Sequence, residues 1–156
     1  MLTPPIRYRR ARRTDFTAID ALLRAAGAPD SGRDRAILRR FRRLVADLGA
    51  DLYVAETDAR LLGVVHVSYA RSLIIGQRAQ LELLVVAADA RGRGIGRGLV
   101  SLAAQRARRR GCAALRYVAA GAADGAGAFL THSGWRSVGD QFEFDLAEAA
   151  QRAQPQ

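Results

Sequence analysis

The sequence contains a single cysteine and no lysine, and each scarcity excludes a class of protein. One cysteine, Cys112, cannot build a disulfide framework or a cysteine-rich zinc site. Two histidines, His66 and His132, are too few for a multi-histidine metal centre. The glycine-rich loop that binds nucleoside triphosphates requires a lysine, so that class is excluded as well. We therefore expect a protein that holds no metal ion.

Long apolar runs and prolines are also scarce. The central apolar stretch Leu83–Ala88 is far too short to cross a bilayer, and the opening segment MLTPPIRYRRARR has no apolar core of signal-peptide length. Only 4 of the 156 residues are proline while 49% are hydrophobic, which argues against intrinsic disorder. These features predict a cytoplasmic protein without membrane contact, with one domain over residues 1–147 and a frayed tail over 148–156.

Positive charge is abundant and is carried by arginine alone. The chain has 25 arginines against 15 acidic residues, a formal charge of +10. Much of that charge falls in an N-terminal arginine cluster (Arg7, Arg9, Arg10, Arg12, Arg13) and a second arginine cluster (Arg33, Arg35, Arg39, Arg40, Arg42, Arg43). Each cluster contains a single aromatic residue, Tyr8 or Phe41, which is too few to stack successive bases. We interpret both clusters as solvated surface, with nucleic acid or a smaller phosphorylated ligand as the alternative partner.

Apolar periodicity predicts the elements of the first half of the chain. Residues 6–12 read as a strand, Thr14 or Asp15 as a helix N-cap, and residues 19–26 as a helix that Gly27 ends. A second helix ends at Gly49 and carries most of its arginines off its apolar stripe. That stripe consists of Ile37, Leu38, Phe41, Leu44, Val45 and Leu48.

The period then changes to two, which predicts strands. Residues 52–56 and 61–69 form a hairpin, residues 71–78 connect it onward through a turn at Gly76-Gln77, and residues 79–87 form a strand whose Leu83–Val86 stretch is buried on both faces. A glycine-rich turn at 89–96, a helix to residue 110, a strand at 113–119, a short helix at 124–133 and a last strand at 142–146 follow. This alternation predicts α/β layers around a mixed sheet.

The glycine-rich turn carries the clearest functional signal. A strand leads into Arg91-Gly92-Arg93-Gly94-Ile95-Gly96, and Arg97 follows in the next helix. Glycines allow close backbone approach, and the first N–H groups of a helix lack internal partners, so this arrangement suits a phosphate. The dinucleotide pattern G-x-G-x-x-G does not fit, because its last glycine falls on Arg97 or Leu99.

The turn instead resembles the Q/R-x-x-G-x-G/A signature of the GNAT N-acetyltransferase superfamily. The segment Phe129-Leu130-Thr131-His132-Ser133-Gly134-Trp135 is similar to the closing pattern of that family, and the resemblance runs from about Ile6 to Leu146. It implies a mixed, mostly antiparallel sheet of six or seven strands with helices on both faces. It also implies a splayed strand pair, here 79–87 and 113–119, that holds acyl-CoA.

The resemblance implies acetyl-CoA as co-substrate and assigns it residues. The backbone of Leu84 to Val86 would pair with the pantetheine arm, and the N–H near Val86 would stabilise the thioester oxyanion. The amides of the glycine-rich turn would hold the pyrophosphate, and Asp124 stands where an asparagine is frequent. The implied cofactor residues are Leu84, Val85, Val86, Arg91, Gly92, Arg93, Gly94, Ile95, Gly96, Arg97 and Asp124.

Catalysis would rest on Glu82 as the general base, four residues before Val86 on the same strand face, with Gln80 able to position a water. The alternative is an ordinary carboxylate that pairs with an arginine. The tyrosine that usually protonates the leaving thiolate is replaced by Leu130. Either another group donates the proton, with His132, Ser133 and Tyr117 as candidates, or the thiolate leaves unassisted, or activity is weak. We expect His66 to be a partnered structural histidine and Cys112 to pack in the core.

Three functions follow from these observations. The first is an acetyl-CoA-dependent N-acetyltransferase whose acceptor site lies beside residues 29–33 and the hairpin at 61–80. Its strongly cationic mouth favours a neutral or anionic acceptor, such as an amino acid or a peptide N-terminus. The alternative is a pocket that the carboxylates of Asp30, Asp34 and Glu82 make locally acidic. The second is a GNAT fold that binds acyl-CoA without catalysis, and the third is a basic module that binds nucleic acid or the ribosome. Many members of the family form dimers, so a homodimer is also expected.

Overall fold

The computed structural model describes residues 4–28, 34–58, 60–119 and 125–139. In this part of the chain the strands are β1 (Arg7–Arg10), β2 (Ala50–Glu56), β3 (Leu61–Ser72), β4 (Gly76–Val86) and β5 (Leu115–Tyr117). The α-helices are α1 (Phe16–Ala25), α2 (Asp34–Ala46), α3 (Ile95–Arg109) and α4 (Gly125–His132). Short 3-10 turns at Arg13–Asp15 and Ala88–Ala90 lead into α1 and out of β4.

The strands form one mixed sheet in the order β1-β2-β3-β4-β5. Neighbours are antiparallel from β1 to β4, whereas β5 runs parallel to β4. The β4–β5 pairing covers only Ala79–Leu81 against Leu115–Tyr117, so the two strands separate beyond Leu81. The predicted mixed sheet with a splayed pair is thus confirmed. Five strands are described where six or seven were expected, and the predicted strand at 142–146 lies outside the described residues.

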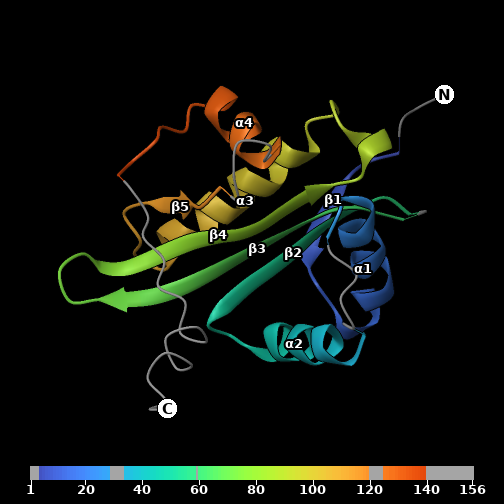
Figure 1. The fold of residues 1–156 in the computed structure, drawn as a ribbon, viewed down its shortest axis with the longest axis horizontal. Coiled ribbons are helices and arrows are strands. Elements are labelled where there is room, and N and C mark those ends of the chain that lie inside the picture. The colour runs from blue at the N-terminus through green and yellow to red at the C-terminus, as the bar shows by residue number, and fades with distance from the viewer. Residues whose placement is uncertain (1–3, 29–33, 59, 120–124, 140–156) are drawn as a thin grey trace, which may run out of the picture.

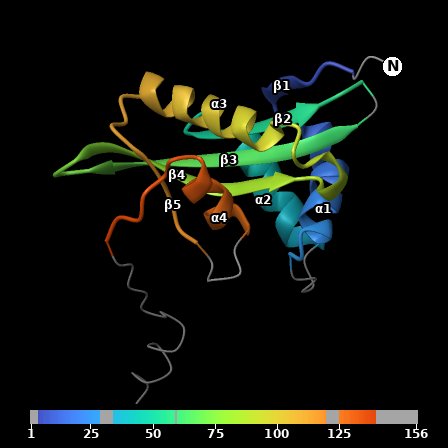
Figure 2. The ribbon, with the colours of Figure 1, turned by 90° about the horizontal axis from the view of Figure 1, so that it is seen from above.

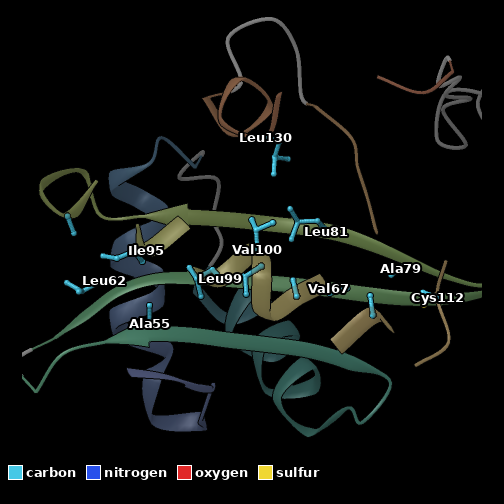
Figure 3. Packing of buried hydrophobic residues seen from close by; sticks show 14 residues of the cluster. Ala55, Leu62, Val67, Ala79, Leu81, Ile95, Leu99, Val100, Cys112 and Leu130 are labelled. Carbon is cyan, nitrogen blue, oxygen red and sulfur yellow. The ribbon is translucent and has the colours of Figure 1, made fainter. Parts of the chain in front are cut away.

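Helices cover both faces of the sheet, as Figure 2 shows: α3 and α4 lie on one face and α1 and α2 on the other. Each face has its own apolar core. On the α3/α4 face, Val67 and Leu81 of the sheet pack with Ile95 and Leu99 of α3, each at most 1% exposed (Figure 3). Burying each such aliphatic side chain stabilises the fold by roughly 1.5–3 kcal/mol. The three-layer arrangement fixes the direction of α3, whose N-terminus lies beside the end of β4 (Figure 1).

Two predicted element ends were wrong. Helix α2 ends at Ala46, and Leu48, predicted to belong to its apolar stripe, is 82% exposed. The reason is Asp47, whose Oδ1 accepts the Gly49 N–H at 2.7 Å and closes a turn before the helix can continue.

The hairpin between β3 and β4 is longer than the alternation predicted. Its turn lies at 73–75, not at Gly76-Gln77, because Ser72 pairs with Gly76 and the Ser72 hydroxyl accepts the Ile75 N–H at 3.3 Å. Gly76 takes a left-handed φ of 71°, which suits a three-residue hairpin loop. Both views show this hairpin extending beyond the helices (Figures 1 and 2).

Candidate functional site

The glycine-rich turn places the start of α3 against the end of β4. Gly92 and Gly94 have left-handed φ values of 75° and 78°, and Gly94 is the N-cap of α3. Ile95, the first helical residue, is 1% exposed and anchors this turn in the core. The backbone N–H groups of the first helical turn have no acceptor within the helix. The turn therefore has the geometry of an anion site, as its sequence predicted.

Three exposed arginines, Arg91, Arg93 and Arg97, flank this anion site. The Arg91 Nε donates to the Val86 carbonyl at 3.4 Å, which ties the turn to the end of β4. The nearby carboxylate of Asp89 is neutralised by Arg60 at 2.6 Å, and that hydrogen bond lowers the pKa of Asp89. The local balance at the turn is thus cationic, which favours a negatively charged ligand.

The end of β4 offers an open backbone edge next to the turn. The Ala87 N–H donates to the Leu62 carbonyl at 2.8 Å, and hydrogen-bonded pairs alternate along an antiparallel ladder. With this register, Val85 bonds to β3, while the N–H and C=O groups of Leu84 and Val86 point away from β3. They point to the side on which β5 has already separated. Leu84 to Val86 can therefore accept an extended ligand as an added strand.

The stretch Leu83–Val86 is half-buried, so the prediction of burial on both faces was wrong. Leu84 and Val86 pack against the α3/α4 core, and Leu83 and Val85 against the α1/α2 core. Burial stays incomplete because β5 pairs with β4 only as far as Leu81. The exposure follows from the same splay that opens the backbone edge.

Glu82 lies on a β-bulge. Val67 of β3 pairs with Leu81 and His66 pairs with Leu83, so Glu82 is the extra residue of β4. A bulge shifts the side-chain alternation by one position. The expectation that Glu82 and Val86 share a strand face was therefore wrong: Val86 packs on the α3/α4 face, and Glu82 lies on the α1/α2 face.

The carboxylate of Glu82 is held by two neighbours on the α1/α2 face. The Ser68 hydroxyl donates to its Oε1, and the Gln80 Nε2 donates to its Oε2 at 3.4 Å. Ser68 and Gln80 are themselves cross-strand partners. Gln80 was predicted to share the face of Glu82, whereas Ser68 was missed, because the strand register that brings them together is not visible in the sequence. The carboxylate is exposed and oriented, as a general base must be.

His66 differs from its expected role as a partnered structural histidine. It lies on β3 between two buried valines, opposite Leu83 and on the same sheet face as Ser68. Its Nε2 is buried and has no hydrogen-bond partner. Burial lowers the pKa of His66 below its ordinary value, and the negative charge of Glu82 partly opposes this shift. The ring is therefore neutral at pH 7 and able to accept a proton.

The substitution at the usual tyrosine position has a structural explanation. Leu130 is 2% exposed and points from α4 toward Leu81 and Val100 (Figure 3), so this position belongs to the core. Of the candidate proton donors, the Ser133 hydroxyl donates to the Phe129 carbonyl at 2.9 Å. His132 Nδ1 lies 3.0 Å from the Ala128 carbonyl. Tyr117 lies on β5, half-buried against the same core.

A hollow of about 370 Å³ lies between α3 and α4, beside the anion site. Its lining combines Arg97, two serines, His132 and the aromatic rings of Phe129 and Trp135. Gly96 makes this close packing possible, because a Cβ at that position would lie 3.3 Å from the Phe129 ring. Asp124 and the loop at 29–33, both expected near the site, lie outside the described residues.

The N-terminal arginine cluster is partly held in ion pairs, so the solvated-surface interpretation was wrong for Arg9 and Arg10, whereas Arg7 is exposed as predicted. Arg9 binds Asp15 at 2.7 Å and Glu56 at 2.6 Å, and Arg7 binds Asp58 at 2.9 Å. Arg10 binds the buried carboxylate of Asp51 at 3.1 Å. These carboxylates lie far away in the sequence or on a separate element, so only folding reveals the pairing.

The second arginine cluster is exposed as predicted. Arg33 lies outside the described residues. The other members lie on α2 and are Arg35, Arg39, Arg40, Arg42 and Arg43. Cys112 is buried in the core, also as predicted, and burial raises the pKa of its thiol. Among the described residues, no three His, Cys, Asp or Glu side chains gather into a potential metal site. No helix in those same ranges is long and apolar enough to span a bilayer.

Comparison with known proteins agrees with this geometry. The chain resembles the crystal structure of a transcriptional regulator from Bacillus halodurans C-125 (24% identity, TM-score 0.78, 91% of this chain and 100% of that chain). It also resembles an aminoglycoside 6'-N-acetyltransferase from Acinetobacter baumannii (20%, 0.78, 90% and 97%). A predicted acetyltransferase from Clostridium acetobutylicum, solved with acetyl-CoA, is a third neighbour (17%, 0.74, 92% and 98%).

A search of curated proteins found no match. The family model described as the acetyltransferase (GNAT) family matches residues 16–135, most of the chain. That range contains the bulge at Glu82, the open edge of β4 and the anion site at the start of α3. The chain therefore belongs to the GNAT acetyltransferase family.

Proposed function

We propose that the protein is an acetyl-CoA-dependent N-acetyltransferase that moves an acetyl group to the amine of a small molecule or peptide. The observation that carries this proposal is the continuity between the open backbone edge at Leu84–Val86 and the anion site of α3. An extended thiol arm that ends in a phosphate group matches both features at once. The neighbour solved with acetyl-CoA supports the choice of co-substrate.

The co-substrate would lie along residues on two consecutive elements. The outward N–H and C=O groups of Leu84 and the outward C=O of Val86 would hydrogen-bond the amides of the pantetheine arm, which leaves the Val86 N–H for the thioester carbonyl. The amides of the turn from Arg91 to Arg97 would hold the pyrophosphate, with the three exposed arginines adding charge. The hollow between α3 and α4 would leave room for the nucleotide end. Acetyl-CoA supplies the activated acyl group, as a thioester with a thiolate leaving group.

Glu82 would act from the α1/α2 face. The acceptor amine reaches the thioester from that face and loses its proton to the Glu82 carboxylate, directly or through a water. The freed amine attacks the thioester carbonyl, and the Val86 N–H stabilises the oxyanion. The C–S bond then breaks. Because Leu130 cannot donate a proton, the thiolate, with a thiol pKa near ~8.5, leaves unassisted or takes its proton from solvent.

The charge of the protein bears on the acceptor. One neighbour is an aminoglycoside acetyltransferase, and aminoglycosides carry several amino groups. This chain, however, exposes five arginines on α2. Such a surface repels polycations over a Debye length of about 10 Å. A neutral or anionic amine, such as an amino acid or a peptide N-terminus, fits this field better.

Thermal unfolding with saturating acetyl-CoA tests the co-substrate. Binding to the native state raises its stability, so we expect an upward shift. The triple variant Arg91→Gln, Arg93→Gln, Arg97→Gln should weaken binding by about tenfold or more, a loss of about 1.4 kcal/mol per tenfold. The matched control is Arg108→Gln with Arg109→Gln, at the far end of α3. No shift in the native protein would refute the proposal.

Thiol release with a panel of amines tests catalysis. Glu82→Gln should lower turnover by about 10²-fold or more and leave the acetyl-CoA shift intact. An unchanged rate would remove Glu82 from the mechanism. A shift without turnover for any amine would favour the alternative of a fold that binds acyl-CoA without catalysis.

Binding of nucleic acid remains the second candidate, because the exposed arginines of α2 have no carboxylate partner within the described ranges. Anisotropy of a labelled RNA or DNA duplex against salt concentration tests it. Binding through α2 requires a steep fall in affinity with salt, and Arg35→Gln with Arg39→Gln and Arg43→Gln should flatten that slope. Affinity that barely changes between low and moderate salt would exclude this candidate.

A further inference from the structure

His66 has a feature that the proposed mechanism leaves unused. Its Nε2 is buried without a hydrogen-bond partner, although nearly all buried polar groups in proteins find one. The ring cannot relieve this by moving with its strand, because β3 is hydrogen-bonded on both sides, to β2 through Leu52 and to β4 through Leu83. An orphaned ring nitrogen on a central strand requires an explanation that packing alone does not provide.

Glu82 lies near this ring, one position along β4 from Leu83, the cross-strand partner of His66. In a regular ladder Glu82, the residue after Leu81, would pair directly with His66. Here Leu83 pairs with His66, and Glu82 is inserted between Leu81 and Leu83. His66, Ser68 and Glu82 therefore share the α1/α2 face at one point of the sheet. Ser68 and Gln80 fix the Glu82 carboxylate on that face through both of its oxygens.

The surroundings of His66 single out Glu82 as its electrostatic partner. Its cross-strand neighbours, Leu52 and Leu83, are apolar. The charge that raises the pKa of His66 is that of Glu82, while burial lowers it to a net value below the ordinary one. The ring is thus a neutral proton acceptor beside an oriented carboxylate.

We propose that His66 is a positioning residue that receives, through Nε2, the proton that Glu82 removes from the acceptor amine. This inference rests on the proposed function. The acceptor ammonium gives its proton to the Glu82 carboxylate, which becomes a carboxylic acid, and the amine is free to attack. Because Nε2 has no hydrogen-bond partner in the resting structure, Glu82 then passes the proton to it after a side-chain rotation that brings the two groups together, and Glu82 is again a carboxylate. The imidazolium returns the proton to solvent, so charge and protons balance over one turnover.

The chain offers a direct spectroscopic test, because it has only two histidines. The ring signals of His66 and His132 can be followed by NMR against pH, with His132→Gln assigning them. Glu82→Gln should lower the midpoint of His66, because it removes the negative charge that favours the imidazolium. His132 is an exposed residue of α4 and should keep its midpoint. A His66 midpoint that does not move in Glu82→Gln would overturn the proposal.

Activity provides the second arm. His66→Gln keeps a polar ring-sized side chain but cannot carry the proton, so kcat should fall about tenfold with an altered acid limb of the pH profile, while KM for acetyl-CoA is unchanged. This loss is smaller than that of about 10²-fold expected for the base itself. A native kcat and pH profile in His66→Gln would refute the relay. If acetyl-CoA fails to bind, the proposed function fails, and the NMR arm still decides whether the two residues are coupled.

Discussion

Replacing Asp51 with asparagine should strongly destabilise the fold. Asp51 is 1% exposed and lies near the start of β2. Its Oδ2 accepts the Tyr69 hydroxyl at 2.7 Å, and its Oδ1 accepts Arg10 Nη1 at 3.1 Å. Arg106 of α3 and Arg110, the residue that follows this helix, approach the carboxylate at 3.3–3.4 Å. One carboxylate thus connects β2 to β1, to β3 and to the C-terminal end of α3.

The structure sets the expected magnitude. Asparagine carries no charge, and its NH2 group presents hydrogens where one of the carboxylate oxygens accepted hydrogen bonds. Removing one partner of a buried ion pair costs about 3–5 kcal/mol. The three arginine side chains keep 24–33% exposure, so solvent screens part of the charge left behind. We therefore expect Asp51→Asn to lower the free energy of unfolding by about 3 kcal/mol at pH 7.

Urea unfolding of the two proteins measures this loss, and the chain offers a matched control. Asp20 pairs with Arg24 at 2.8 Å across one turn of α1, on the surface. Asp20→Asn should cost only about 0.3–0.5 kcal/mol, as exposed helical pairs do. A loss below about 1 kcal/mol for Asp51→Asn, comparable to the control, would refute the reasoning that burial and shared partners make this carboxylate structural.

The pH dependence gives a second check. Burial favours the neutral form of Asp51, but hydrogen bonds from Tyr69, Arg106 and Arg110 outweigh it and hold its pKa below the ordinary 3.8. A lowered folded-state pKa contributes stability that is fully present above the unfolded-state pKa and is lost as pH falls through the folded-state value. The stability difference between native protein and Asp51→Asn should thus stay constant from pH 7 to about 5. The difference should narrow below pH ~4, and an unchanged difference there would contradict the lowered pKa of Asp51.

Three further substitutions separate packing, backbone and hydrogen-bond contributions. Leu81→Ala, at 1% exposure, should lower the free energy of unfolding by about 2–5 kcal/mol, whereas Leu73→Ala at the fully exposed hairpin tip should stay within about 0.5 kcal/mol in the same urea experiment. Gly94→Ala forces a Cβ into a φ of 78° and should cost about 1–2 kcal/mol and weaken acetyl-CoA binding, measured by thermal shift, while Gly125→Ala should do neither. Tyr69→Phe leaves the buried carboxylate without its shortest hydrogen bond, and urea unfolding should show a loss of about 1–3 kcal/mol. A neutral result for Leu81 or Tyr69, or equal effects of the two glycine variants, would contradict the corresponding contact.

Local pattern was sufficient for most elements and for the glycine-rich turn that we propose binds the co-substrate. The apolar stripe of α3 and the glycines before it are short-range features, because helix periodicity and a left-handed φ depend on residues within a few positions. Those features also predicted the glycine-rich turn at Gly92 to Arg97 and the helix that it opens. The predicted end of α2 was wrong because the Asp47 carboxylate accepts the Gly49 N–H and stops the helix, although the apolar periodicity continues.

The acceptor half depended on long-range pairing that no local pattern encodes. The sequence by itself determined that a glycine-rich turn follows a strand and opens an amphipathic helix. Only the tertiary structure decided that a bulge moves Glu82 to the face opposite Val86. It likewise decided that His66 Nε2 lies without a partner and that Arg9 and Arg10 pair with carboxylates of other elements. The physical reason is register: one inserted residue reverses the faces of a strand, and its position is set by the neighbouring strand.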